Sequence, residues 1–290
     1  MVVEEVSTRL KCMAKKQPIV AILYDFDKTL ATDDMQNFSF IPTLGMTPAE
    51  FWGETDALAK KTGMEKILSY MYMMIEKSKE KGIPLTKDFL NKLGKEVKLY
   101  EGVTAWFKRI NAYAEELGVK VEHYIVSSGT KEIIEGTSIA KEFKEIYACE
   151  FLFDDNGIAT WPKIAINYTA KTQFVFRVVK GALNSHDDVG VNSRIGPKRV
   201  PFRNIIYIGD GLTDIPCMTL VKEKGGKSIA IYPKGKKDKV YPLFEDERVN
   251  YICRGDYSVN SDLDKIVKLI ITQVSILETL INKESELLKK

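Results

Sequence analysis

Carboxylates gather in two short motifs, each directly after an apolar run. Asp25 and Asp27 end the run that begins after Pro18, and Asp210 and Asp214 flank a glycine-containing turn after a later run. Residues two apart on an extended chain point the same way, so Asp25 and Asp27 can reach one site. Carboxylates this close repel one another unless a cation or a proton is shared. The pattern favours a hard divalent cation, and Mg²⁺ fits because it accepts a few carboxylates and keeps several waters.

Hydroxyl and basic side chains suited to a phosphate group lie in two further places. Ser127 and Ser128 end another apolar run and precede Gly129, so hydroxyl and backbone N–H donors meet at a predicted helix start. Lys171 lies in the first turn of a predicted helix, where a cation is unfavourable against the helix dipole unless an anion is near. The alternative, Lys163, follows a predicted hairpin rather than opening a helix. We therefore expect Lys171 to offset phosphate charge.

The apolar runs are short and alternate with helical patterns, which predicts an α/β fold with a doubly wound, mostly parallel sheet. Ligands of such sheets bind beyond the carboxyl ends of the strands, where the acidic and hydroxyl residues lie. The predicted strands cover residues 19–24, 121–129, 203–211 and 227–233, with 249–253 as a possible fifth. A hairpin is predicted at 150–161, turning at Asn156-Gly157.

The alternation breaks between residues 35 and 102. Thr47, Pro48 and Glu50 form a capping box with proline at the first helical position,. Helical patterns follow at 48–61, 64–81 and 86–97. We expect residues 35–102 to form a helical cap domain over the strand tips, and residues 1–34 with 103–290 to form a Rossmann-like catalytic core. We expect a long loop at the polar stretch 184–203. We also expect one amphipathic helix, or two, at residues 260–290, which would cover the core rather than form a dimer.

Composition is that of an ordinary globular protein of 290 residues, with 44% hydrophobic residues and a formal net charge of +3. So small an excess of basic side chains does not favour nucleic acid or an anionic membrane as a partner. The four cysteines form no CxxC pair and indicate reduced thiols. The longest apolar run is too short to span a bilayer. We expect a cytoplasmic protein, monomeric or homodimeric, with a small-molecule partner.

The motifs DFDKT at 25–29 and GDGLTD at 209–214, with Ser127 and Lys171 between them, resemble the four motifs of the haloacid dehalogenase superfamily in order and spacing,. The helical insertion after the first strand, and the hairpin followed by NYTAK, are similar to its phosphoserine-phosphatase-like branch. The resemblance covers residues 18–233. It implies a Mg²⁺-dependent phosphatase with a covalent aspartyl-phosphate intermediate.

The resemblance assigns roles to the acids. Asp25 matches the nucleophile, and Asp27 matches the general acid and base. Asp25, the backbone carbonyl of Asp27 and Asp210 match the Mg²⁺ ligands, and Asp214 matches a residue that orients Lys171 or a metal-bound water. In this family an acid two residues after the nucleophile favours a phosphatase or a phosphomutase.

The resemblance also assigns the phosphate and substrate contacts. Ser127 and the N–H of Ser128 would hold phosphate oxygens, and Lys171 would neutralise charge in the transition state. Thr29, from the first motif, is counted with the phosphate- and substrate-binding residues. Asp34 occupies the position where the phosphoserine branch has a glutamate that contacts the substrate amine. Because the aspartate side chain is shorter, the resemblance does not identify the substrate.

Three functions remain open at this point. The leading hypothesis is a phosphomonoesterase for a small metabolite, with a phosphomutase as its variant. A catalytically silent binding or regulatory protein on the same fold is the second. A phosphatase of protein or nucleic-acid ends is the third, although a cap argues against such substrates. His123, inside a strand pattern, is expected to be structural, and the lysines at 234–239 to form a solvated loop.

Overall fold

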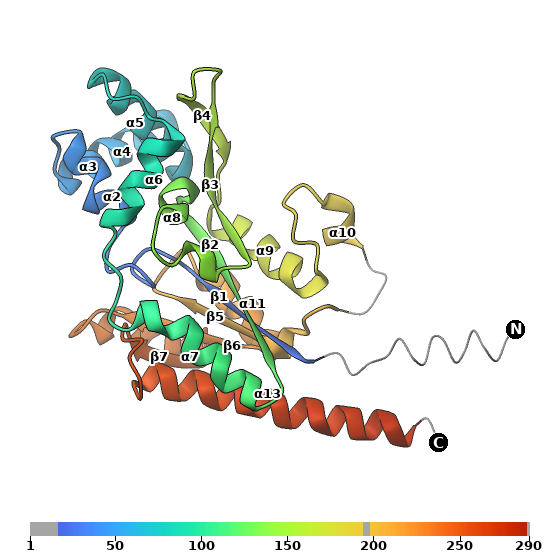
Figure 1. The fold of residues 1–290 in the computed structure, drawn as a ribbon. Coiled ribbons are helices and arrows are strands. Elements are labelled where there is room, and N and C mark those ends of the chain that lie inside the picture. The colour runs from blue at the N-terminus through green and yellow to red at the C-terminus, as the bar shows by residue number, and fades with distance from the viewer. Residues whose placement is uncertain (1–16, 194–197, 289–290) are drawn as a thin grey trace, which may run out of the picture.

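The computed structural model describes residues 17–193 and 198–288, and its centre is a seven-stranded sheet (Figure 1). The strand order is β4-β3-β2-β1-β5-β6-β7, and every neighbouring pair is parallel except β3 with β4. The doubly wound, mostly parallel sheet is therefore confirmed. The strands are β1 Ile19–Tyr24, β2 Lys120–Thr130, β3 Glu145–Phe153, β4 Ala159–Ile164, β5 Ile205–Gly209, β6 Lys227–Tyr232 and β7 Tyr251–Arg254.

Strand β1 lies at the centre because its sequence, IVAILY, is apolar throughout and all but its first residue are buried. Parallel strands that are covered on both faces typically have such continuous apolar sequences. The register pairs Tyr24 with Ile125 of β2 and with Ile208 of β5. The chain order of the strands reverses beside β1, and a crevice at this point is where doubly wound sheets bind ligands.

Helices cover both faces of the sheet. Helices α7 and α13 pack on each other along one face, whereas α9 and α11 pack on each other against the other (Figure 1). The bounds are α7 Val103–Glu116, α8 Lys131–Glu135, α9 Tyr168–Lys180, α10 Asp188–Asn192, α11 Ile215–Glu223, α12 Tyr241–Glu245 and α13 Asp262–Leu287. Across the described ranges, no helix is long and apolar enough to cross a membrane.

The segment between β1 and α7 is helical, and its helices lie beside the β3–β4 hairpin (Figure 1). They are α2 Met35–Phe38, α3 Phe40–Thr43, α4 Pro48–Thr62, α5 Lys66–Glu80 and α6 Lys87–Leu93. The capping box of Thr47 and Glu50 is present at the start of α4. The predicted helix 86–97 is too long: α6 ends at Leu93 and a 3₁₀ turn follows, where Gly94 lies against the backbone of Ile133. The limits of the cap domain stay a prediction.

Two other segments differ from expectation. The hairpin turns at Asn156-Gly157 as predicted, but its first strand begins at Glu145, where it pairs with β2. The polar stretch 184–203 is not all loop, because Asp187 caps the short helix α10 through the N–H of Gly190. The buried guanidinium of Arg177 donates to the backbone carbonyls of Asn184, Ser185 and Asp187 and fixes the beginning of this stretch, of which residues 194–197 lie outside the described ranges.

His123 is structural, as predicted. Its Nδ1 lies 3.0 Å from the hydroxyl of Tyr24, which accepts from the indole N–H of Trp106, and its Nε2 lies 3.0 Å from Oδ1 of Asn111. These partners suit a neutral imidazole that accepts at Nδ1 and donates at Nε2. Burial lowers the pKa of His123 to about 3, so the ring stays neutral and the chain of hydrogen bonds holds α7 to the sheet.

Glu122 of β2 is a buried carboxylate with three cationic or hydroxyl donors. It accepts from Arg199 Nη2 at 2.6 and 2.7 Å, from Lys144 Nζ at 2.7 Å and from the Tyr124 hydroxyl at 2.6 Å. Burial alone would raise the pKa of the carboxyl, but these donors lower it to about 2 from the ordinary 4.5. The resulting stability is present above pH 4.5 and is lost as the pH falls toward 2,.

We expect Glu122→Gln to lower the free energy of unfolding by about 3 kcal/mol at pH 7, because the cations lose their counter-charge. The difference from the wild type should shrink as the pH falls from about 4.5 to about 2. Urea unfolding across this pH range measures it. Glu145→Gln, at an exposed acid on the neighbouring strand, is the control and should change little. A difference independent of pH would contradict this account of Glu122.

Candidate active site

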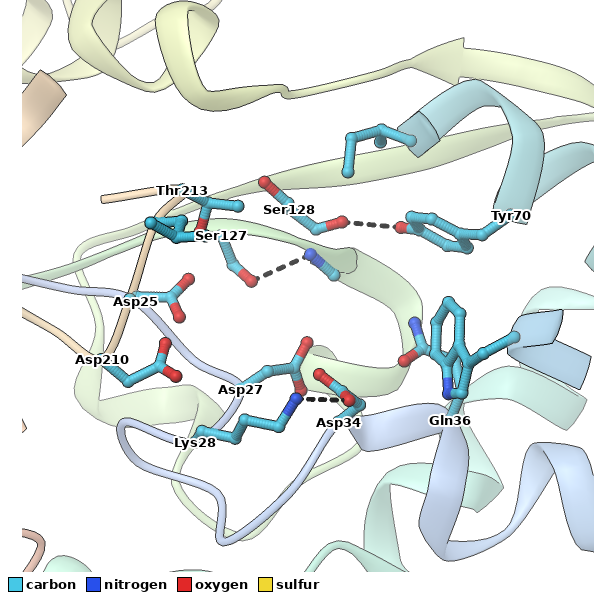
Figure 2. A pocket seen from close by; sticks show the side chains of 15 residues that line it. Asp25, Asp27, Lys28, Asp34, Gln36, Tyr70, Ser127, Ser128, Asp210 and Thr213 are labelled. Carbon is cyan, nitrogen blue, oxygen red and sulfur yellow. Dashed lines mark hydrogen bonds and ion pairs between the residues drawn. The ribbon is translucent and has the colours of Figure 1, made fainter. Parts of the chain in front are cut away.

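A cavity of about 340 Å³ opens at the carboxyl ends of β1, β2 and β5 (Figure 2). The sheet register brings these ends together, since Asp25 follows β1, Ser127 lies near the end of β2 and Asp210 follows β5. Side chains from α2, α4 and α5 complete the wall opposite the strands. The lining residues are Asp25, Asp27, Lys28, Asp34, Gln36, Trp52, Ile67, Tyr70, Ser127, Ser128, Gly129, Asp210, Gly211, Leu212 and Thr213.

Lys171 lies beneath this cavity and is completely buried. Its Nζ donates to Asp25 Oδ1 and to Asp214 Oδ1, both at 2.8 Å, and the Tyr207 hydroxyl also donates to Asp214 Oδ1. Burial works against the charge, but the two carboxylates raise the pKa of Lys171, so the side chain is an ammonium. The alternative, Lys163, contacts Glu150 instead. Lys171 is therefore the lysine that the fold joins to the acids.

Three carboxylates can offer oxygen atoms to one point. Oxygens of Asp25, Asp210 and Asp214 lie within 4.8 Å of one another. Asp214 Oδ2 is buried and has no hydrogen-bond partner among the described residues. This oxygen can lie close to the backbone at position 209 because residue 209 is glycine. A Cβ there would lie 2.6 Å from the oxygen. A hard divalent cation fits this set of oxygen donors, one of them unpaired.

The same acids repel one another in the absence of a cation. Burial, together with the charge of Asp214, raises the pKa of Asp25 to about 6, although Lys171 opposes this. Burial and the charges of Asp25 and Asp214 raise the pKa of Asp210 well above its ordinary value. The site thus carries more negative charge than Lys171 can offset, and a bound cation would relieve it.

Asp27 lines the cavity, and its carboxyl points away from Asp25 and Asp210 and toward Asp34 (Figure 2). Its Oδ1 accepts from the backbone N–H of Met35 at 2.7 Å. Burial and the charges of Asp34 and Asp25 raise its pKa well above the ordinary value, so the side chain can carry a proton. Its carboxylate is outside the group of three, and its predicted role as a metal ligand through the backbone carbonyl stays a prediction.

The serines offer donors to the cavity. Ser127 Oγ accepts from the N–H of Gly129 at 2.9 Å, which leaves its hydroxyl proton for a ligand,. The carbonyl of Ser128 accepts from the Tyr70 hydroxyl at 2.7 Å, and its own Oγ has no partner among the described residues (Figure 2). Thr29 does not join them: it is fully buried and is absent from the cavity wall.

Comparison with known proteins identifies the family of this chain. The sequence model of the haloacid dehalogenase (HAD)-like hydrolases matches residues 22–219, which is more than half of the chain. The chain belongs to this family. An uncharacterised protein of Borreliella burgdorferi is 26% identical over 279 residues, covering 87% of this chain and 96% of that protein.

Solved structures of HAD hydrolases have the same fold. A HAD-family hydrolase of Salmonella enterica serovar Typhi superposes with a TM-score of 0.57 at 16% identity, covering 93% of this chain and 78% of that one. A substrate-bound phosphoserine phosphatase gives 0.52 at 17% identity, with coverages of 88% and 99%. Cytosolic 5′-nucleotidase IIIB bound to cytidine gives 0.50 at 16%, with coverages of 96% and 92%. At these identities the likeness shows the fold alone.

Sequence reasoning missed several residues of this HAD hydrolase's cavity. Trp52 and Tyr70 come from α4 and α5, and only tertiary contacts bring them to the strand ends. Lys28 belongs to the DFDKT motif, but the motif alone gave it no role. Its φ is +55°, which is unusual for a residue with a side chain,. Its Nζ lies 2.5 Å from Asp34 Oδ2 (Figure 2), so Asp34, the predicted substrate contact, already has a cationic partner.

We expect the backbone of Lys28 to be strained, because a Cβ is disfavoured in the left-handed region. Lys28→Gly and Lys28→Met both remove the ion pair with Asp34, but only glycine relieves the strain. The glycine variant should therefore be more stable than the methionine variant by about 1 kcal/mol, measured by urea unfolding. A methionine variant as stable as the glycine variant would show that position 28 is not strained.

Proposed function

We propose that the protein is a Mg²⁺-dependent phosphomonoesterase that forms an acyl phosphate on Asp25 as a covalent intermediate. The observation that supports it most is the Lys171 ammonium held between Asp25 and Asp214 at 2.8 Å from each. A fixed cation beside one carboxylate, with serine donors across the cavity, suits attack on a phosphate group. Asp25, Asp210, Asp214 and the carbonyl of Asp27 would hold the metal, with Asp214 contributing from beneath.

In the first step Asp25 attacks phosphorus. Its Oδ1 accepts from Lys171, and its Oδ2 forms the new bond to phosphorus as the bond to the leaving oxygen breaks. The raised pKa of Asp27 lets this group give its proton to the departing alkoxide. Ser127 and Ser128 hold the phosphoryl oxygens, and Lys171, beside Asp25, neutralises charge in the transition state,. Mg²⁺, when bound, neutralises negative charge on the phosphate and the carboxylates.

In the second step the intermediate is hydrolysed. Asp27, now a carboxylate, takes a proton from a water molecule that attacks phosphorus. The bond between phosphorus and Asp25 breaks, which releases inorganic phosphate and restores both acids. The same side chain serves both steps because the leaving alcohol and the incoming water occupy the same side of the phosphorus.

The cavity suits a small substrate. Its volume of about 340 Å³ and the aromatic side chains of Trp52 and Tyr70 on its wall leave room for a compact organic group,. Relatives of the fold include a phosphoserine phosphatase and a 5′-nucleotidase. Phosphoserine and nucleoside monophosphates are therefore the first substrates to test. A phosphomutase or a silent binding protein would share the site but release no phosphate.

We expect phosphate release from at least one ester of a small-molecule panel with Mg²⁺, lost on chelation. Asp25→Asn should reduce the rate by at least about 10³-fold, because the amide is a poor nucleophile. Asp33→Asn, which changes an acid in the same segment but outside the cavity wall, is the control. A folded wild type that binds Mg²⁺ and phosphate without turnover would favour the silent binding protein.

We expect Asp27→Asn to slow the hydrolysis of alkyl phosphates by about 10²- to 10⁴-fold, because its amide cannot move the proton. A p-nitrophenyl ester needs no proton for its leaving group, so the first step should survive and the second should stall. Stopped-flow absorbance would then show a burst of nitrophenolate followed by slow turnover. Equal losses on both ester types without a burst would contradict the assignment of Asp27.

A further inference from the structure

The C-terminal helix α13 has two apolar faces, and the fold uses one of them. Its buried apolar residues, such as Val267, Ile271 and Val274, pack toward the sheet. A second set forms an outer stripe, defined as Leu269, Ile276, Leu280 and Leu287, with exposures of 68, 58, 62 and 70%. At about 100° per residue, this stripe lies on the side of the helix opposite the buried set. Covering the core therefore does not explain it.

The stripe is accessible along its whole length. Val274 is the last buried position on α13, and the helix continues well beyond it (Figure 1). Ser275 and Glu278 still bond to Leu117, Arg203 and Asn204, but from the side of the helix away from the stripe. The first and last of the four side chains are 18 positions apart, or about 27 Å along the helix,. Gln273 and Lys283 lie on the same face in the two longer gaps, so the stripe consists of an apolar pair at its centre and one leucine at each end. Four large apolar side chains aligned on the exposed face of one helix indicate an interaction surface.

The spacing of the stripe fits a second copy of the same helix. Its members are seven, four and seven residues apart, so the order reads the same from either end. In an antiparallel pair, Leu269 of one copy meets Leu287 of the other, and Ile276 meets Leu280. A two-fold interface requires this kind of self-complementary patch. The antiparallel arrangement also sets the helix dipoles in opposition, which is favourable.

Charge argues against a lipid surface as the occupant. Over Asp262–Leu287 the helix carries five acids and three lysines, whereas helices that lie on membranes are rich in lysine and arginine on their polar face. We propose that the outer stripe is a homodimer interface in which two α13 helices pack antiparallel. Four side chains from each copy make a small contact compared with the about 800 Å² per partner of a standard interface, so the dimer should dissociate on dilution.

Sedimentation of the full chain from about 1 to about 100 µM tests this directly, because a small interface is expected to dissociate within such a range. The wild type should pass from monomer to dimer. Ile276→Glu and Leu280→Glu should each raise the dissociation constant at least about 100-fold. Val189→Glu, at an apolar residue 84% exposed outside α13, should dimerise like the wild type. Circular dichroism confirms that each variant is folded.

Orientation has its own test. Leu269→Cys mixed with Leu287→Cys should form a disulfide-linked dimer in higher yield than either variant alone. A wild type that stays monomeric throughout, or stripe variants that still dimerise, would overturn the proposal. So would a monomer that floats with phospholipid vesicles, which would assign the stripe to a membrane surface. None of these outcomes depends on the phosphatase assignment.

Discussion

The buried ammonium of Lys171 is the interaction on which the site depends. A lysine without water is stable as a cation only beside negative groups, and Asp25 and Asp214 supply them at 2.8 Å each. Those two acids lie 189 residues apart in the sequence. The parallel register of β1 with β5 brings them together. Gly209 has no side chain and so leaves room for the Asp214 carboxylate. Helix α9 must then begin where it does, with Asn167 as its cap.

The negative charges of the acids at this site exceed the positive charge of Lys171. Asp25, Asp210 and Asp214 converge around one lysine, and burial makes each unpaired negative charge costly,. The raised pKa of Asp27 has the same origin, but this residue lies outside the three-carboxylate group. Burial and neighbouring charges raise the pKa of Asp27 and of Asp210 alike. Their positions differ, since Asp27 lies beside Asp34 and Asp210 belongs to the three-carboxylate group, and position is what suits neighbouring carboxyls to different roles.

The sequence predicted the strand tips well because buried parallel strands are continuous apolar runs that end in polar residues. It failed where tertiary contacts decide. The start of β3 at Glu145 depends on pairing with β2, and Tyr70 reaches the cavity only through the packing of α5. Thr29 shares a motif with Asp25, yet the turn buries it away from the cavity. The C-terminal helix does cover the core, with buried residues as far as Val274 and polar contacts as far as Glu278, but the helical pattern alone did not reveal its exposed apolar stripe.

The central claim is that phosphate passes through Asp25. The most direct measurement is to quench the enzyme with acid during turnover of its best substrate and to map the phosphoryl group by peptide mass spectrometry, since acyl phosphates of this kind are covalent intermediates. The account predicts phosphoryl label on the peptide that contains Asp25, with more of it in Asp27→Asn when a p-nitrophenyl ester is the substrate. Turnover with the label on another residue would contradict it, as would turnover in which neither protein carries a label.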